Sequence, residues 1–182
     1  CTATLVMTVN PAASPITGTK TVCYGQTATL STADAPAGSW TSFLVTVGAG
    51  PGGAGIVSAA SFGVGTVTYT LPTGCMRTAT VNVRPLPSAI TGTPAVCAGS
   101  TTSLSSASAG GIWSSSNPSA ATISSTGVVS GITAGNTTIT YTLPTSCRTT
   151  ASVVVNALPA SIGGAMSVCA GSSAMMTNAS AG

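Results

Sequence analysis

The sequence is almost devoid of charged side chains. Its 182 residues include one Asp, no Glu, no His and four basic residues, Lys20, Arg77, Arg84 and Arg148. The side chains that perform acid/base catalysis or bind hard metal ions are nearly all missing, so we predict no enzyme, no metal site and no cofactor. The four cations are scattered, whereas nucleic-acid binding needs a clustered basic surface. Nucleic acid is therefore not an expected partner.

Long hydrophobic runs are absent as well. Hydrophobic residues make up 43% of the chain, but they are mostly Ala, Val and Ile interleaved with Ser, Thr and Gly. No run approaches the roughly 18 apolar residues of a membrane span, so we expect a soluble protein without one. Disordered chains can share this low charge, but the regular alternation described below argues against disorder.

The cysteines point to disulfides rather than to metal binding. No two of them form a CxxC pair, and there is no histidine to complete a zinc site. Disulfides formed in an oxidising compartment explain them better. The chain starts with cysteine and shows no signal peptide, so we expect a mature product or an excerpt of something longer. The six candidates for structural disulfides are Cys1, Cys23, Cys75, Cys97, Cys147 and Cys169.

The spacing of these cysteines reveals an internal repeat. Each member of one series precedes a member of the other by 22 residues, whereas the remaining intervals are 52 and 50. The sequences around them match too, since YTLPTGC corresponds to YTLPTSC and SPITGTKTVCYGQ corresponds to SAITGTPAVCAGS. A fixed period of this kind indicates tandem structural units. Spacings of 74 and 72 residues separate the members of both series, Cys23, Cys97 and Cys169, and Cys1, Cys75 and Cys147.

Within each repeat, apolar and polar residues alternate with a period of two, which predicts strands with one buried face. Threonine, frequent between the apolar positions, favours strands through its branched β-carbon. Seven short strands separated by Gly, Pro, Asn and Ser predict an all-β fold of tandem immunoglobulin-like sandwiches. In the better-formed copy the predicted strands are Ile90–Val96, Thr101–Ser106, Gly111–Ser116, Ala121–Ser124, Gly127–Ile132, Thr137–Leu143 and Thr149–Asn156.

The repeat predicts a division of the chain into four parts. Residues 1–12 correspond to the last strand of a preceding repeat. Residues 13–86 form one repeat with a divergent middle, and residues 87–158 form the next. Residues 159–182 correspond to the first strands of an incomplete following repeat. We therefore expect an extended array of stacked domains.

One segment resembles a known family. Gly110–Thr142, with the sequence GGIWSSSNPSAATISSTGVVSGITAGNTTITYT, resembles the bacterial immunoglobulin-like domains of group 2. In that family a W-S-S-S-N stretch precedes an A-T-I/V strand, a G-V-V-x-G turn and strand, and a G-x-x-x-I-T-Y strand. The neighbouring copy keeps Trp40 and the last of these strands but departs from the S-S-N and G-V-V-x-G signatures.

The cysteine pattern carries a second resemblance. V-C-x-G before the second strand, with a cysteine just before the last strand, is similar to the tandem repeats of giant secreted surface proteins from gliding and filament-bearing bacteria of the Bacteroidota type. This resemblance implies an extracellular or cell-surface location and a role in adhesion or filament building. The implied partners are other copies of the chain or neighbouring repeats.

Two pairs of aromatic residues are predicted to lie in the domain cores. Trp40 and Trp113 are at equivalent places on the third strand, where a sandwich usually buries a large aromatic ring. Sugar stacking on an exposed tryptophan is the alternative. Tyr69 and Tyr141 are expected to face the core with their hydroxyls near one end of the sandwich. The lone Asp34 is expected in a turn rather than in a calcium site.

The sequence leaves two disulfide arrangements open. Strand parity places Cys23 or Cys97 at one end of a domain and Cys75 or Cys147 at the other, about 23 Å away, whereas bridged α-carbons lie about 5 to 6 Å apart. This favours a bond between domains, from Cys23 to Cys147. The usual internal bridge of a small sandwich favours Cys23 with Cys75 and Cys97 with Cys147. In either arrangement, each disulfide would stabilise the folded protein by about 3 to 5 kcal/mol in the chain-entropy model.

The leading functional hypothesis is a non-enzymatic structural repeat region of an extracellular filament or cell-surface adhesin, stabilised by disulfides. A carbohydrate-binding module with surface glycans as ligands is one alternative, and it predicts Trp40 or Trp113 exposed in a shallow groove. A fibre subunit that polymerises by donating a strand is another, and it predicts that Cys1–Asn10 fills a groove in a second chain.

Overall fold

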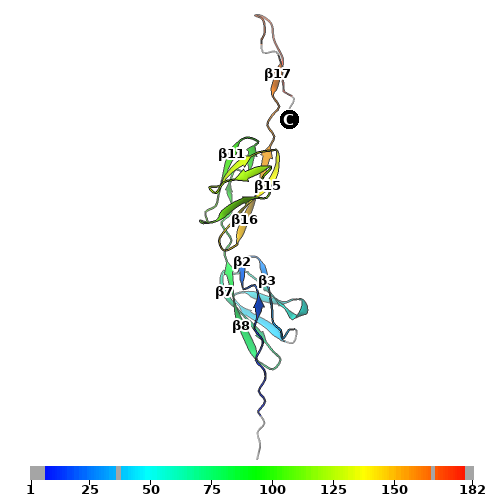
Figure 1. Ribbon diagram of the computed structural model, residues 1–182, viewed down its shortest axis with the longest axis vertical. Coiled ribbons are helices and arrows are strands. Elements are labelled where there is room, and N and C mark those ends of the chain that lie inside the picture. Colours follow the sequence, from blue (N-terminus) through cyan, green and yellow to red (C-terminus); the bar gives the residue numbers. More distant parts are fainter. Residues whose placement is uncertain (1–6, 36–37, 165–166, 179–182) are drawn as a thin grey trace, which may run out of the picture. The chain divides into compact units, whose positions relative to one another are not determined.

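The chain folds into two compact units of β-structure (Figure 1). A computed structural model describes residues 7–35, 38–164 and 167–178. Unit 1 comprises Cys1–Leu86 and unit 2 comprises Pro87–Gly182. The described residues contain no α-helix and one turn of 3-10 helix, at Pro51–Gly53. The predicted all-β fold is confirmed.

Unit 1 consists of two four-stranded sheets that share one hydrophobic core. The strand order is β1-β3-β6-β5 in one sheet and β2-β8-β7-β4 in the other. Its strands are β1 (Thr17–Gly18), β2 (Thr21–Cys23), β3 (Thr27–Ser31), β4 (Ser39–Phe43), β5 (Thr46–Ala49), β6 (Gly55–Ser58), β7 (Gly63–Thr70) and β8 (Met76–Arg84).

Unit 2 repeats this arrangement and carries one additional hairpin. Its two four-stranded sheets have the orders β13-β14-β11-β9 and β10-β16-β15-β12, and the hairpin pairs β17 with β18. The strands are β9 (Thr91–Gly92), β10 (Ala95–Cys97), β11 (Thr101–Ser105), β12 (Ile112–Ser115), β13 (Ala121–Ile123), β14 (Val128–Gly131), β15 (Gly135–Thr142), β16 (Arg148–Asn156), β17 (Ile162–Gly164) and β18 (Met176–Asn178).

The core of each unit comes from the alternation that the sequence shows. In unit 1, Val67 and Tyr69 on β7 face inward with Val81 on β8, and all three are 0% exposed. The other sheet contributes Leu30 and Val57, which are equally buried. The residues between the inward positions of β7 are mostly threonines on the outer face. Unit 2 builds its core in the same way around Val129, Ile139 and Val153.

The first strand of each repeat is divided between the two sheets. The sequence predicted one strand over Ile90–Val96 in an antiparallel sandwich, and this is wrong in detail. β9 pairs antiparallel with β11, whereas β10 pairs parallel with β16. Pro94, which has no backbone N–H, lies between the two pieces. Gly92 has a φ of 120°, and a β-carbon there would lie 2.3 Å from the Ser103 carbonyl oxygen, so the chain bends at a residue without a side chain.

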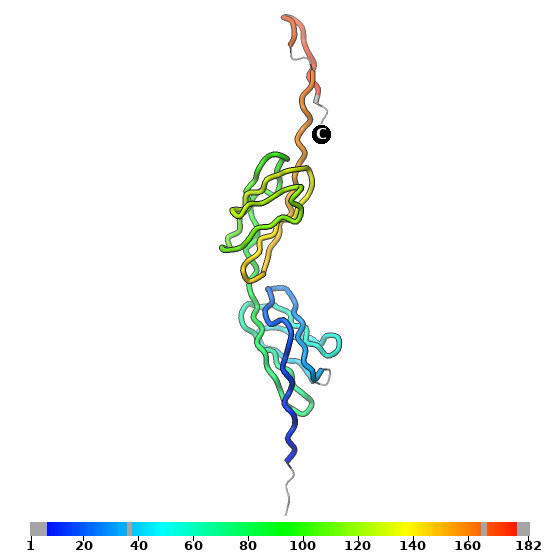
Figure 2. The backbone as a smooth tube through the Cα atoms, viewed as in Figure 1, coloured from blue at the N-terminus to red at the C-terminus, as the bar shows by residue number. Residues whose placement is uncertain are grey.

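The divergent middle of unit 1 still forms strands. β5 and β6 pair antiparallel, with Thr46 opposite Ser58 and Ala49 opposite Gly55. They sit at the same edge of their sheet as β13 and β14 do in unit 2. In each unit the chain enters at one end of the sandwich and leaves at the opposite end, as the tube in Figure 2 shows.

Candidate functional site

In both units a tyrosine hydroxyl closes one loop, the loop between β3 and β4 in unit 1 and the loop between β11 and β12 in unit 2. In unit 2 the Tyr141 hydroxyl accepts a hydrogen bond from the Gly111 N–H (2.9 Å) and donates one to the Ser108 carbonyl (2.7 Å). The corresponding Tyr69 hydroxyl accepts from the Gly38 N–H (2.7 Å) and donates to the carbonyl of Asp34 (3.2 Å). Each hydroxyl therefore satisfies one donor and one acceptor of an irregular loop.

The same loop holds the segment through which the chain enters each unit. In unit 1 the Asp34 carboxylate accepts hydrogen bonds from the backbone N–H and the hydroxyl of Ser14. In unit 2 the hydroxyl of Ser108 accepts the hydrogen bond of the Ser88 N–H (2.8 Å). Asp34 lies in a turn, as expected, but its carboxylate also ties down the entering chain. We name this end of each unit, with its tyrosine hydroxyl, the entry end.

Each tryptophan packs against the tyrosine of its own unit. The ring centroids of Trp40 and Tyr69 are 4.8 Å apart, and those of Trp113 and Tyr141 are 4.5 Å apart. The tyrosines are buried, whereas the tryptophans are half-buried and pack against the edge of the core. The indole N–H of Trp40 donates to the Gly53 carbonyl (2.9 Å). Both indoles are thus held by contacts within their own unit.

In unit 1 the two cysteines lie at opposite ends of one sheet. Cys23 ends β2 and is the register partner of Arg84, the last residue of β8. Cys75 directly precedes β8. The nine residues of β8 therefore separate the two positions by about 30 Å. We call the cysteine after the first strand the exit cysteine and the one before the last strand the entry cysteine.

Unit 2 places its cysteines in the same way. The exit cysteine Cys97 pairs in register with Asn156 at the end of β16, and the entry cysteine Cys147 directly precedes β16. An internal bridge in either unit would need α-carbons about 5 to 6 Å apart. The separation along the last strand is several times larger, so the exit and entry cysteines of one unit cannot bond to each other.

The cysteines differ in their bonding state. Cys75, Cys97 and Cys169 are free. The two internal pairs considered from the sequence are accordingly not formed. Cys23 and Cys147, by contrast, are disulfide-bonded. The prediction for Cys1 lies outside the described residues.

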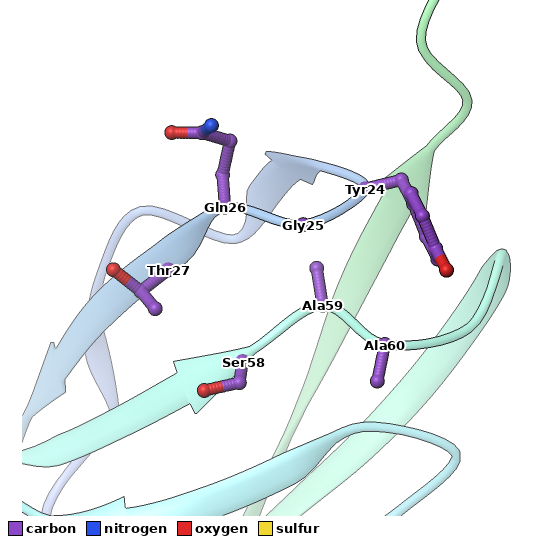
Figure 3. A pocket seen from close by; sticks show the side chains of 7 residues that line it. All are labelled: Tyr24, Gly25, Gln26, Thr27, Ser58, Ala59 and Ala60. Atoms are coloured by element: carbon purple, nitrogen blue, oxygen red, sulfur yellow. The ribbon is translucent and has the colours of Figure 1, made fainter.

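Unit 1 has an exposed pair of aromatic side chains that was not predicted from the sequence. The rings of Tyr24 and Phe62 are 4.8 Å apart and are 41% and 59% exposed. Tyr24 borders an open pocket of about 330 Å³, on the far side of which lie Gln26 and Thr27 (Figure 3). A comparison of the two copies was the signal that could have found this pair, because unit 2 has small alanines at both positions.

The described parts of the chain offer no metal centre. Over residues 7–35, 38–164 and 167–178, no three His, Cys, Asp or Glu side chains come together in a way that would hold an ion. In the same residues, no helix has the length and hydrophobicity needed to cross a membrane.

Comparisons with known proteins identify the fold. The family model of the bacterial Ig-like domain (group 2) matches residues 93–154. A C-terminal 282-residue fragment of intimin, solved with the intimin-binding domain of the translocated intimin receptor, is 17% identical with a TM-score of 0.50, and the match covers 82% of this chain and 67% of that one. Invasin, a bacterial integrin-binding protein, is 16% identical with a TM-score of 0.51, over 79% of this chain and 38% of invasin. No curated protein matches the chain.

These matches agree with the geometry of both units. Each unit is an immunoglobulin-like β-sandwich: its first strand is divided between two sheets, and the core lies between them. The tryptophan is on β4 in unit 1 and on β12 in unit 2. The chain is therefore a tandem of immunoglobulin-like domains, and a segment of its second unit, residues 93–154, is similar to the bacterial Ig-like domains of group 2. At identities of 16–17%, the solved structures establish the fold and nothing further.

Proposed function

We propose that this chain is a non-enzymatic, load-bearing repeat region of an extracellular filament or cell-surface adhesin. One observation carries the proposal. In each unit, the second part of the divided first strand and the last strand are neighbours in one sheet and run parallel, β2 beside β8 and β10 beside β16. A force on the two ends of the chain then acts on these two strands in opposite directions.

Hydrogen bonds at both ends of this parallel pair resist such a force. In unit 2 the Val154 N–H donates to the Pro94 carbonyl (3.0 Å) and the Ala98 N–H donates to the Asn156 carbonyl (2.9 Å). Unit 1 has the same two bonds at the corresponding residues. Parallel strands pulled from opposite ends slide along each other, so their bonds must break together rather than one after another. We call this pair the shear clamp.

Some terminal residues are exposed although their counterparts in the complete repeats lie in the core. This supports the assignment of the terminal segments to further repeats. Val9 is 86% exposed, although Val83, at the same position of the repeat, is 2% exposed. Met176 is 61% exposed, whereas its counterpart Leu104 is 3% exposed. β17 and β18 also keep the register of the first hairpin of a domain, since Gly164 pairs with Met176 as Gly92 pairs with Leu104. Such side chains are suited to cores completed by other repeats, which supports residues 1–12 and 159–182 as parts of them.

Single-molecule force spectroscopy of the chain under reducing conditions tests the shear clamp. We expect two unfolding events, each adding about 25 nm for a repeat of 72 or 74 residues. Ala98→Pro removes the donor at one end of the unit 2 clamp, so one of the two events should move to lower force while the other stays. Urea unfolding of the variant must show unit 2 still folded. Unchanged forces in that folded variant would contradict a load-bearing clamp.

The cellular location has its own test. An antibody raised against the chain should label intact bacteria that produce it, without permeabilisation. Disulfide-bonded cysteines fit an oxidising compartment of this kind. Labelling only after lysis would contradict the surface location.

A glycan-binding role is the second candidate, and Tyr24 with Phe62 favours it. An exposed aromatic pair beside uncharged polar side chains suits a neutral sugar. Trp40 also lines a pocket, of about 340 Å³, but its ring is half-buried and offers less free surface for stacking. A glycan array should then show binding that Tyr24→Ala abolishes. Absence of binding on the array would leave the structural role alone.

Strand donation between chains is tested by the state of association. If the segment Cys1–Asn10 completed the sandwich of a second chain, the reduced protein would form polymers in solution. Light scattering that gives the mass of one chain at micromolar concentration would exclude this mode of assembly.

A further inference from the structure

The bonding states of the cysteines pose a question about pairing. The exit cysteine of unit 1, Cys23, and the entry cysteine of unit 2, Cys147, are both disulfide-bonded. Their counterparts at the same positions of the other unit, Cys97 and Cys75, are both free. The separation of about 30 Å along the last strand rules out a bond between Cys23 and Cys75 and one between Cys97 and Cys147. Since Cys97 and Cys169 are both free, the partner of Cys147 lies outside unit 2.

Unit 1 by itself shows what an entry cysteine lies next to. The Cys75 sulfur is 4.0 Å from the carbonyl oxygen of Asn10. Asn10 precedes a proline, and it ends the segment that leads into unit 1. In unit 1 the entry cysteine thus lies beside the segment that leads into the unit.

Cys147 occupies the same repeat position as Cys75, so we expect it to lie beside the corresponding residue. The counterpart of Asn10 is Arg84, because both follow a valine at the same repeat position and both precede a proline. Arg84 is the register partner of Cys23 in the parallel pair of β2 and β8. If Cys147 lies beside Arg84 as Cys75 lies beside Asn10, it also lies beside Cys23.

The connection between the two units is short enough for this placement. Arg84 ends β8, and Ser88 is held at the entry end of unit 2 by Ser108. Four residue steps span at most about 14 Å. Two of the three connecting residues are prolines, which restrict the backbone further. The chain between the last residue of β8 and the first residue held at the entry end of unit 2 is therefore short enough to permit a bond between Cys23 and Cys147.

We propose that Cys23 and Cys147 are bonded to each other, and that this bond is one member of a periodic series. The rule is that the exit cysteine of each repeat bonds to the entry cysteine of the next. Under this rule the free Cys97 is a half-site for the entry cysteine of a following repeat, and the free Cys75 is a half-site for the exit cysteine of a preceding one. The inference rests on the tandem arrangement in the proposed function and names its partner, a further repeat of the same kind.

Burial agrees with the rule. Cys147 is 1% exposed, whereas its counterpart Cys75 is half-buried. Cys23 is half-buried, whereas its counterpart Cys97 is exposed. At both repeat positions the bonded cysteine is the more covered one, and the exposed thiol of Cys97 is accessible to a partner.

The rule also explains which cysteine spacing stays constant. The interval from an entry cysteine to the next exit cysteine is 22 residues in all three instances, whereas the other interval is 52 or 50. A segment of 22 residues contains a last strand, the connection and the next first strand. With the disulfides in place, tension would run through these segments and bypass the rest of each domain. The shear clamp would then bear load only when the disulfides are reduced.

Formation of each bond needs a two-electron oxidant. Two thiols lose two protons and two electrons, a sulfur–sulfur bond forms, and the electrons reduce another disulfide to two thiols. A thiol–disulfide oxidoreductase outside the cytoplasm, or oxidised glutathione in the test tube, is the class of oxidant required.

Peptide mapping tests the pair directly. Trypsin should cleave the chain after Lys20, Arg77 and Arg148, while Pro85 blocks cleavage after Arg84. After refolding in a glutathione redox buffer and alkylation, we expect fragments 21–77 and 78–148 to run as one species that separates on reduction. The double variant Cys75→Ser, Cys97→Ser should keep the linkage, and Cys147→Ser should lose it. Separate fragments, each closed by an internal disulfide, would overturn the proposal.

An extended chain tests the periodic rule. Residues 1–158 followed by a second copy of residues 87–182 recreate the connection between repeats after Leu158. We expect Cys97 of the first copy to become bonded to the entry cysteine of the added copy, so that the mass falls by about 2 Da more than in the parent chain. If Cys97 still reacts with alkylating reagents in the folded, oxidised protein, the rule is wrong.

Force measurement separates this inference from the proposed function. In the oxidised chain the bond should shield residues 24–146 from tension, and roughly two thirds of the contour length should become inaccessible until reductant is added. Full extension of the oxidised chain would refute the Cys23–Cys147 pair. The forces measured on the reduced chain would still decide the shear clamp.

Discussion

Replacement of Tyr141 by phenylalanine tests whether the hydroxyl at the entry end holds unit 2 together. Tyr141 is 5% exposed, and its hydroxyl makes two hydrogen bonds, to the Gly111 N–H and the Ser108 carbonyl. Phenylalanine keeps the ring that packs on Trp113 at 4.5 Å and removes only the oxygen. Any loss of stability can then be attributed to the two hydrogen bonds.

The magnitude follows from the state in which these partners are left. A hydrogen bond contributes about 0.5 to 1.5 kcal/mol net, and an unsatisfied buried partner costs more. Gly111 and Ser108 are half-buried, so water reaches them in part and limits the penalty. We expect Tyr141→Phe to lower the unfolding free energy of unit 2 by about 2 kcal/mol. For a domain of 60 to 100 residues this corresponds to a fall in Tm of roughly 8 to 16 °C.

Hydrogen-exchange mass spectrometry across a urea series measures the unfolding of the two units separately. Peptides from residues 87–158 should shift to a lower urea midpoint, and peptides from unit 1 should not shift. Tyr24→Phe is the matched control, because the Tyr24 side chain is 41% exposed and its hydroxyl has no hydrogen bond within the described residues. If Tyr141→Phe shifts its unit no more than the control does, the hydroxyl does not stabilise the entry end.

Four residues with positive φ give further predictions. Ser146 has a φ of 68°, and Gly74 occupies the same repeat position with a φ of 83°. Because glycine adopts positive φ more easily than serine, Ser146→Gly should stabilise unit 2 by about 0.5 kcal/mol and Gly74→Ser should destabilise unit 1. Urea unfolding measures both changes. Gly127→Ala should destabilise unit 2 by about 3 kcal/mol or more, because a β-carbon there would lie 2.2 Å from the Leu104 carbonyl oxygen. Gly110→Ala, with a similar φ and open space, should cost only about 1 to 2 kcal/mol. Equal losses for the two alanine variants would contradict the steric argument.

Much of the fold could be predicted from the sequence because its main features are local. The alternation that buries Val67 and Val81 is a property of neighbouring residues, and the internal repeat doubles the signal. The predicted strand Thr149–Asn156 differs from the observed β16 by a single residue. The divided first strand was missed because its bend depends on contact between Gly92 and a different strand.

The side-chain contacts at the two ends of the domains were harder to predict. The bond between Ser14 and Asp34 joins residues 20 positions apart across a loop, and no pattern in the sequence marks the pair. The exposure of Tyr24 and Phe62 was missed for a related reason, since both lie in turns where alternation gives no face. Strand parity, by contrast, was enough to separate the two cysteines of one domain, because it depends only on the number of strands between them.

The two copies within this chain differ most where the proposed tension path does not run. The segments around the cysteines, YTLPTGC and YTLPTSC, are nearly identical, whereas the residues from β4 to β6 have little in common with those from β12 to β14. Unit 1 contains a glycine-rich 3-10 turn there, and the corresponding residues of unit 2 lie within the segment that the group 2 family model matches. If tension passes only through the 22-residue segments, the middle strands need to fill a core but not to carry load. Exchange of residues 41–62 for residues 114–134 should then change the urea midpoint of unit 1 while leaving the oxidised chain's resistance to extension unaltered. A weaker oxidised chain after this exchange would show that the middle strands do carry load.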